Sequence, residues 1–432
     1  MGCKLNQYEV EALRSGFAAE DFEIVAPGAA ADVYVVNTCT VTGSGDADSR
    51  KALRRARRLN PQATVVATGC YAQRRPEELR NAGAELVIGN GQKTELVKHV
   101  QAHLAGELVA DFDPQERPLR QRFLEMDSAT HSGRTRGTLQ IQDGCDEHCT
   151  YCIIPTVRGP SVSRPIADII EQAQRMVDGG YRELALTGVH TGSYGQEGSQ
   201  GLSLVTLLER LDRITGLERV RLNSVEPACV TDQLIDFAAS PSTKLCRHFH
   251  VPMQSGDDQV LKRMGRRYGS GFYAERLHRL AAAVADCSLG ADIMVGFPGE
   301  DDELFENTVA FTDSLPLTYL HVFRYSPRDE TPALRLGEHA DPSQKRSRAR
   351  RLIELSEQKR MAFHSRFVGR KVSVLTEEVE KEAGSGLACG LTDNYMRVRF
   401  APPSGLRAND LVEVTITHVR EDIAFGEAGD KR

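Results

Sequence analysis

The sequence predicts an α/β protein with an N-terminal doubly wound α/β domain, a partial barrel of six β/α units and a small C-terminal β-barrel. Three observations support this class. Short β-branched runs alternate with amphipathic stretches up to about residue 365, as in parallel strands joined by helices. A polar stretch that contains Pro114 and Pro118 interrupts this alternation, and β-rich runs replace it near the C-terminus. The expected domains are 1–110, 134–368 and 369–432, with 111–133 as a linker.

In the first domain, three cysteines lie beside predicted elements. A helical pattern covers 8–17, and buried parallel strands are expected at 32–36 and 64–68. Cys39 and Cys70 follow these two strands, whereas Cys3 precedes the helix. Loops after the carboxyl ends of parallel strands gather at one sheet edge, so the three thiols can hold a metal cluster there. The alternative is that they are buried as small apolar side chains.

The second domain contains six strand-like runs separated by helical patterns such as 165–178 and 203–214. The strands are expected at 138–142, 184–187, 219–222, 248–252, 291–295 and 321–325. Six β/α units suggest a partial barrel that is open on one side, with its active site at the carboxyl ends of the strands. The third domain has β-rich runs at 371–375, 396–400 and 411–417.

The motif CDEHCTYC follows the first barrel strand and supplies Cys145, Cys149 and Cys152 from one short loop. Three thiolates on a four-iron cube leave one iron free to bind a substrate or cofactor. A structural zinc site or a ferredoxin-type cluster would instead require four ligands. A Cys3His zinc site that uses His148 is the alternative.

This loop resembles the cluster loop of the radical S-adenosylmethionine (SAM) enzymes. With the second set of cysteines, the chain resembles the radical SAM methylthiotransferases over nearly its full length. Four motifs are similar to the branch that acts on threonylcarbamoyladenosine in tRNA: NTCTVT at 37–42, GCYAQ at 69–73, LTGVHTGSYG at 186–195 and TDNYM at 392–396. The alternatives are the branches that act on isopentenyladenosine in tRNA or on a ribosomal-protein aspartate, and, in another class, a non-catalytic zinc-dependent RNA-binding protein.

The resemblance implies two 4Fe-4S clusters and SAM as cofactors. Cys145, Cys149 and Cys152 would ligate the cluster that chelates SAM, and Cys3, Cys39 and Cys70 the second one. A 5′-deoxyadenosyl radical would remove hydrogen from carbon 2 of the modified adenine beside the anticodon, and the second cluster would present a methylated sulfur. The implied partners are the anticodon stem-loop of tRNA and an electron donor such as a flavodoxin or ferredoxin.

Several residues at the mouth of the predicted barrel are candidates for SAM contacts. Thr187 and Gly188 follow the second strand, where radical SAM enzymes often have a glycine pair, although Val189 replaces the second glycine here. Glu226 follows the third strand and can bind a ribose hydroxyl or the SAM amine, or be a plain surface acid. Gln254 and Gly296 follow the fourth and fifth strands, and Gly296 resembles the segment that flanks the adenine.

Composition indicates an ordinary globular protein, with 432 residues, 26% of them charged, and a net charge of −6. No apolar run is long enough to span a membrane, and no secretory signal pattern is present. Ten cysteines in such a chain favour the reducing cytoplasm and metal binding over disulfides. Basic residues are clustered, with six in 50–58 and further ones in 345–351, and such clusters can bind phosphates.

Two further expectations concern the ends of the chain. The C-terminal domain resembles the small RNA-binding barrel called TRAM, and since it has more acidic than basic residues, any RNA contact would come from a local face such as Tyr395, Arg397 and Arg399. At the other end, only Met1 and Gly2 precede Cys3, whereas the resemblance implies a strand there. We therefore expect the natural start to lie upstream; the alternative is a shortened variant in which the cluster anchors Cys3.

Overall fold

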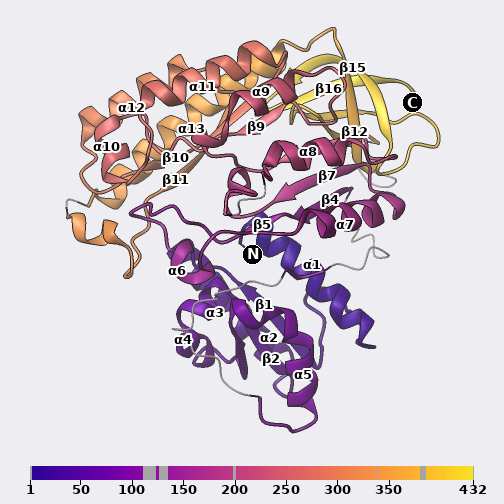
Figure 1. Cartoon of the computed structure of the whole chain (residues 1–432), viewed down its shortest axis with the longest axis vertical. Helices are drawn as coiled ribbons and strands as arrows, with labels where there is room; N and C mark the ends of the chain where they lie inside the picture. Colours follow the sequence, from indigo (N-terminus) through magenta and orange to yellow (C-terminus); the bar gives the residue numbers. More distant parts are fainter. Residues whose placement is uncertain are drawn as a thin grey trace.

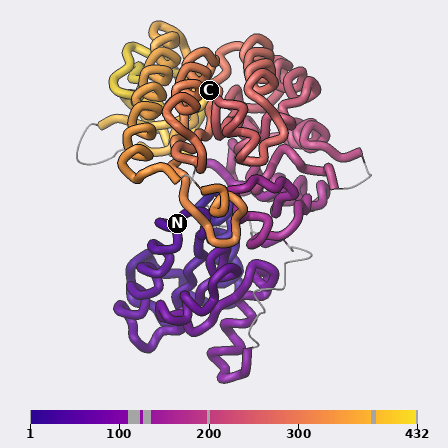
Figure 2. The backbone as a smooth tube through the Cα atoms, turned by 90° about the vertical axis from the view of Figure 1, so that its left-hand side faces the viewer, coloured from indigo at the N-terminus to yellow at the C-terminus, as the bar shows by residue number. Residues whose placement is uncertain are grey.

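The computed structural model describes residues 2–109, 123–125, 135–197, 201–337, 339–379 and 386–431. Most of the predicted linker at 111–133 lies outside the described residues. The fold has three parts in chain order, and the N-terminal part lies at one end of the molecule (Figure 1 and Figure 2).

The N-terminal part is a three-layer α/β domain, as predicted. Its parallel strands are β1 (Val33–Thr38), β2 (Thr64–Gly69) and β3 (Leu86–Ile88), in that order across the sheet. Val66 of β2 packs with residues of α1 (Lys4–Ala19) and α5 (Leu96–Leu104) on one face. Its neighbour Val65 packs with α2 (Gly43–Leu59), α3 (Cys70–Arg74) and α4 (Pro76–Arg80) on the other. Strand β3 was not predicted from the sequence, because its three residues are too short a run to stand out.

The second part is a partial barrel of six parallel strands, which confirms the sequence prediction. Its strands are β4 (Arg136–Gln140), β7 (Glu183–Thr187), β8 (Arg219–Leu222), β9 (His248–His250), β10 (Ser288–Val295) and β11 (Tyr319–Arg324). The orders β4-β7-β8 and β9-β10-β11 are hydrogen-bonded sheets, and single bridges from Val220 to Leu245 and from Ser224 to His250 join them. The strands therefore follow chain order around the barrel.

Helices cover the outside of this barrel (Figure 1). They are α7 (Ile166–Asp178), α8 (Leu204–Asp212), α9 (Asp232–Ala239), α10 (Asp258–Arg263), α11 (Ser270–Ala283), α12 (Asp302–Ser314) and α13 (Pro342–Ser365). Side-chain oxygens of Ser203, Thr231, Asp257 and Asp301 accept backbone N–H groups in the first turns of α8, α9, α10 and α12, which fixes where these helices begin. Short 3₁₀ turns occur at Asn90–Glu95, Thr191–Ser193, Pro227–Cys229 and Pro332–Leu336.

The C-terminal part is a closed five-stranded barrel, consistent with a TRAM-like domain. Its strands are β12 (Lys371–Val379), β13 (Ala388–Thr392), β14 (Arg397–Ala401), β15 (Leu411–Arg420) and β16 (Ile423–Lys431), in the closed order β12-β13-β14-β16-β15. Arg219 and Arg221 of β8 donate to backbone carbonyls at the end of β13 and in the turn after it. The small barrel therefore covers the amino ends of the large barrel's strands.

Tyr395 points inward at this junction, so it differs from the RNA-facing position expected for it. Its ring stacks on His248 with centroids 4.2 Å apart. Arg397 and Arg399 remain exposed on β14. Among the described helices, none combines the length and the apolar character needed to cross a membrane.

Candidate functional site

The loop that carries Cys145, Cys149 and Cys152 is closed at its base by two short strands. β5 (Gln142–Asp143) pairs antiparallel with β6 (Val162–Ser163), and the Cys145 N–H donates to the Gly159 carbonyl at 3.2 Å. Gly144 begins the loop with φ of +70°, and a β-carbon there would lie 1.9 Å from the Pro160 carbonyl oxygen. Only glycine fits this turn, so the sequence Asp-Gly-Cys fixes where the loop leaves the strand.

The three thiols of this loop are free and partly buried. Burial raises the pKa of Cys145 to about 11 and that of Cys152 to about 12, and the neighbouring Cys149 adds to both shifts. Such thiols stay protonated until a metal displaces the proton, as expected of ligands rather than of nucleophiles. Arg266 donates to the Cys149 sulfur at 3.3 Å and so compensates its charge when it is ionised.

The spacing of these sulfurs does not suit a single ion. Ligands of one tetrahedral zinc lie about 3–4 Å apart. Among the described residues, neither cysteine set brings three ligand atoms within 4.8 Å of one another. His148, the proposed fourth zinc ligand, has an exposed side chain. Sulfurs held farther apart fit separate irons of one cluster, so the donor set favours an iron-sulfur cube over zinc.

The second cysteine set also comes together, as expected from the sheet. Cys39 follows β1, Cys70 begins α3 after β2, and Cys3 caps the amino end of α1. Burial, with smaller contributions from Cys70 and Cys3, raises the pKa of Cys39 to about 11. A β-carbon on Gly2 would lie 3.2 Å from the β-carbon of Cys39, which places the start of the chain against this loop.

A buried charge network connects the two cysteine sets. Arg158 ends the short helix α6 (Ile154–Arg158), which directly follows the first cysteine loop and contacts α3 (Figure 1). It donates to the Cys70 sulfur at 3.2 Å, to Glu9 at 3.0 Å and to both Asp143 oxygens at 3.0 and 2.9 Å. Lys93 lies 2.8 Å from the other Glu9 oxygen. Since these groups are all buried, Arg158 holds the two domains together at the metal-binding region.

The candidate SAM-contact residues lie at the carboxyl ends of the barrel strands. Thr187 ends β7, and its buried hydroxyl makes no hydrogen bond in the described residues. Gly188 lies close to Gln142: a β-carbon on Gly188 would be 2.9 Å from the Gln142 amide oxygen. That oxygen accepts the His190 N–H at 2.8 Å, so Gln142 fixes the segment after β7.

Glu226, Gln254 and Gly296 lie at the same end of the barrel. Glu226 pairs with Arg266, which also contacts Cys149, so this acid is linked to the cysteine loop. Gln254 adopts φ of +67°, a strained conformation for a non-glycine residue and one often found at functional sites. Gly296, with φ of +70°, donates its N–H to the Glu300 carboxylate.

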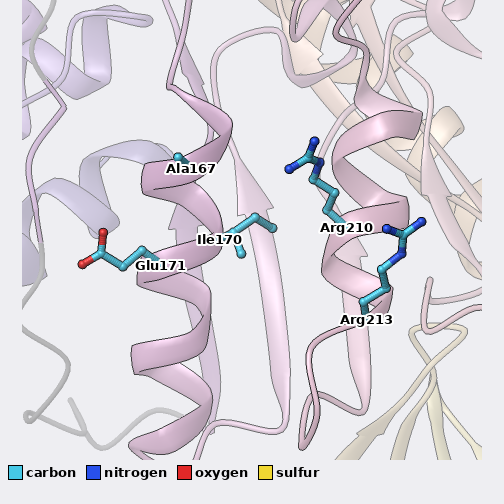
Figure 3. Close-up of a pocket in the computed structure, with 5 residues that line it drawn as sticks. All are labelled: Ala167, Ile170, Glu171, Arg210 and Arg213. Atoms are coloured by element: carbon cyan, nitrogen blue, oxygen red, sulfur yellow. The ribbon is translucent and has the colours of Figure 1, made fainter.

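Two hollows lie at different places on the large barrel. A cavity of about 490 Å³ lies between Thr42 and Ser44 after Cys39, the end of β11 and Lys345 at the start of α13, so it opens between the N-terminal domain and the large barrel. The hollow in Figure 3 instead lies on the outer helical layer, where Ile170 of α7 and Arg210 of α8 extend toward the space between the helices. It is lined by neither set of cysteines.

Sequence reasoning did not find Arg158, Arg266 or Gln142. Arg158 lies six residues after Cys152, and a buried arginine directly beyond a cysteine loop is a usable signal. Arg266 comes from a different β/α unit, 117 residues away from Cys149, so only the fold brings the two together.

Comparisons with known proteins agree with this arrangement. Residues 1–89 match the model of the uncharacterized protein family UPF0004, and residues 139–312 match the radical SAM superfamily. The threonylcarbamoyladenosine tRNA methylthiotransferase MtaB of Bacillus subtilis (strain 168) is 39% identical over 93% of this chain and 89% of its own length. The protein of the same name from Aquifex aeolicus (strain VF5) is 35% identical over 92% of this chain and 95% of its own length.

A solved structure with a similar fold is the radical S-adenosylmethionine methyltransferase TsrM from Kitasatospora setae. Its TM-score is 0.58 with 17% identity, over 76% of this chain and 73% of that one.

Proposed function

This chain belongs to the threonylcarbamoyladenosine tRNA methylthiotransferase family of radical SAM enzymes, and we propose that it uses two 4Fe-4S clusters held by its two cysteine sets. It is a tRNA methylthiotransferase, and its product is the 2-methylthio derivative of threonylcarbamoyladenosine. Cys145, Cys149 and Cys152 are the proposed ligands of the SAM-binding cluster, and Cys3, Cys39 and Cys70 those of the second cluster.

The donor chemistry supports this assignment. Each set offers three free thiols and no fourth cysteine, which leaves one iron of each cube open. When bound, the first cluster and SAM supply the radical chemistry that an inert aryl C–H bond requires. The chain itself contributes position and charge. Arg266 donates to the Cys149 sulfur and pairs with Glu226. Arg158 likewise donates to the Cys70 sulfur and pairs with Asp143.

The SAM-contact proposal concerns Thr187, Gly188, Glu226, Gln254 and Gly296. Their shared place at the carboxyl ends of β7 to β10 supports it, because ligands of such barrels bind there. The buried hydroxyl of Thr187, which makes no hydrogen bond in the described residues, and the close approach of Gly188 to Gln142 add to this support. Because Glu226 already pairs with Arg266, its proposed contact with SAM would be shared with that arginine.

The proposed macromolecular partner is the anticodon stem-loop of a tRNA in the cytoplasm, and the proposed electron donor is a flavodoxin or ferredoxin. Two exposed basic surfaces support the RNA proposal. Arg54, Arg55 and Arg58 are exposed on α2. Arg346 and Arg350 are exposed on α13, which also supplies Lys345 to the cavity between the metal-binding domains. Exposed guanidinium groups on these two helices can neutralise phosphates of the tRNA backbone.

Cysteine substitutions test the two-cluster proposal. Reconstituted wild type should hold about eight irons per chain, and Cys39→Ala or Cys149→Ala about four. Cys149→Ala should abolish SAM cleavage. Cys39→Ala should retain SAM cleavage and lose methylthio transfer. The matched control is Cys389→Ala on β13, outside both sets, which should behave as wild type. Normal methylthiolated product from Cys39→Ala would refute the second cluster.

Nucleoside analysis tests the substrate. tRNA from a strain that lacks this gene should contain threonylcarbamoyladenosine without its 2-methylthio derivative, and the isopentenyladenosine derivative should be unchanged. If the methylthio group were lost from isopentenyladenosine instead, the substrate of this chain would be isopentenyladenosine in tRNA.

A further inference from the structure

Three side chains that neither cluster uses converge inside the barrel: His250 of β9, Asp292 of β10 and His321 of β11. Asp292 and His321 are direct neighbours in the parallel register, and His250 pairs with Gly290, two residues before Asp292. Adjacent strands therefore bring the three side chains together. Asp292 and His321 lie within β10 and β11, and His250 is the last residue of β9, whereas the cysteines of both sets lie outside the barrel strands.

The spacing of the three side chains is that of ligands around one ion. His250 Nε2 lies 3.2 Å from Asp292 Oδ1, and His321 Nδ1 lies 3.5 Å from the same oxygen. All three ligand atoms are within 4.8 Å of one another. With metal–ligand distances of about 2.0–2.2 Å, nitrogen and oxygen ligands of a tetrahedral zinc lie about 3.3–3.5 Å apart.

His250 Nε2 lies close to Asp292 without a well-aligned hydrogen bond. This nitrogen is buried and has no hydrogen-bond partner in the described residues, although the Asp292 oxygen is only 3.2 Å away. On the other side of the ring, Nδ1 lies 2.8 Å from the Ser224 hydroxyl. A hydrogen bond at Nδ1 that fixes the tautomer and leaves Nε2 free is the usual support of a metal-binding histidine.

The surroundings leave the carboxylate available. The nearby Arg221 is already paired with Glu183 at 2.7 Å, and Lys4 donates to Asn223 at 2.9 Å. His321 is exposed and lines a cavity of about 340 Å³ at the junction with the C-terminal barrel, which provides an entry path.

We propose that His250, Asp292 and His321 bind one divalent transition-metal ion, with Zn²⁺ the best match. Two imidazoles and one carboxylate form a three-ligand site with at least one open position. The open position takes a water or an anionic oxygen that enters from the cavity. This ion is separate from the irons held by the cysteines, and the proposal does not depend on the substrate of the enzyme.

The test uses the full chain with its iron-sulfur clusters assembled, so that the cysteines are occupied. Protein is incubated with Zn²⁺, desalted, and analysed for zinc, iron and sulfide. Wild type should retain one zinc per chain with unchanged iron. Asp292→Asn and His321→Ala should reduce retained zinc at least tenfold. His278→Ala, an exposed histidine on α11, is the matched control and should retain zinc as wild type does.

Ser224→Ala gives a second measurement that keeps all three ligands. Because Ser224 only orients His250, its loss should weaken zinc affinity about 10–100-fold without removing the site. Co²⁺ in place of zinc should give weak visible bands without thiolate charge transfer. Equal zinc retention in wild type and Asp292→Asn, or zinc uptake that displaces iron, would overturn the proposal.

Discussion

Replacing Arg158 by methionine tests the connection between the N-terminal domain and the large barrel. Methionine keeps the length of the side chain and removes its charge. Lys93 remains 2.8 Å from Glu9, so Glu9 keeps a partner. Asp143 loses both of its bonds to Arg158, at 3.0 and 2.9 Å, and keeps the Gly144 N–H at 2.7 Å. The principal cost is therefore one buried carboxylate without a cation.

Removing one partner of a buried ion pair costs about 3–5 kcal/mol, a large part of the roughly 5–15 kcal/mol that stabilises a typical domain. We expect the urea midpoint of the cluster-free protein to fall by about 1–2 M. Arg158→Lys keeps the positive charge but loses the forked geometry of the guanidinium group. Its urea midpoint should therefore lie between those of wild type and Arg158→Met. The control is Arg175→Met, whose surface pair with Glu171 at 2.6 Å should contribute less than about 1 kcal/mol.

The same substitution should also affect metal binding. Burial raises the pKa of the Cys70 thiol, and the charge of Arg158 counteracts that rise. Without Arg158 the thiolate forms less readily, so the second cluster should assemble poorly, and iron should fall from about eight toward about four per chain. An unchanged urea midpoint together with full iron loading in Arg158→Met would refute the role assigned to the network.

Three other outcomes are expected. Gly144→Ala should prevent assembly of the SAM-binding cluster, because its β-carbon would meet the Pro160 carbonyl, whereas Gly271→Ala, which has open space, should load iron normally. Burial opposes ionisation of Glu9, but Arg158 and Lys93 outweigh it and lower its pKa to about 2. The ionised Glu9 should therefore stabilise the fold by about 3 kcal/mol above about pH 5, and this stabilisation should be lost as pH falls toward 2. The urea midpoint of wild type should fall over this pH range, whereas that of Glu9→Gln should fall less. An equal pH dependence of the urea midpoint in the two proteins would contradict this role of Glu9. Arg266→Ala should lower SAM cleavage about 10–100-fold with iron retained in the second cluster, and unchanged cleavage would rule out its support of Cys149.

The sequence predicted the elements that have a strong local pattern. The six barrel strands all lie where β-branched or apolar runs indicated them, and β8 matches the predicted bounds at 219–222. β9 ends at His250, two residues earlier than expected, because the chain turns toward Gln254 at positive φ. The cysteine loops were predictable because their spacing is local, or because parallel strands must end at one sheet edge.

Contacts between distant segments could not be predicted in this way. Arg158 and Cys70 are 88 residues apart, and Arg219 and the carbonyl of Leu391 are 172 apart. The periodicity of apolar residues indicates which face of a helix or strand is buried. It does not indicate which polar group of another domain will contact that element. The inward position of Tyr395 has the same origin, since its stacking partner His248 belongs to the large barrel.

The junction between the two barrels limits how this protein can be divided or recombined. Arg221 is fully buried, and Asp393 and Thr392 supply carbonyl partners for two of its nitrogens at 3.0 Å. Arg247 depends on the Asp393 carboxylate in the same way. The C-terminal barrel therefore cannot be exchanged for that of a relative without regard to these contacts. A chimaera that receives this module from a relative must preserve the turn at 392–394, or the large barrel loses the carbonyl partners of the buried Arg221 and the carboxylate partner of the half-buried Arg247.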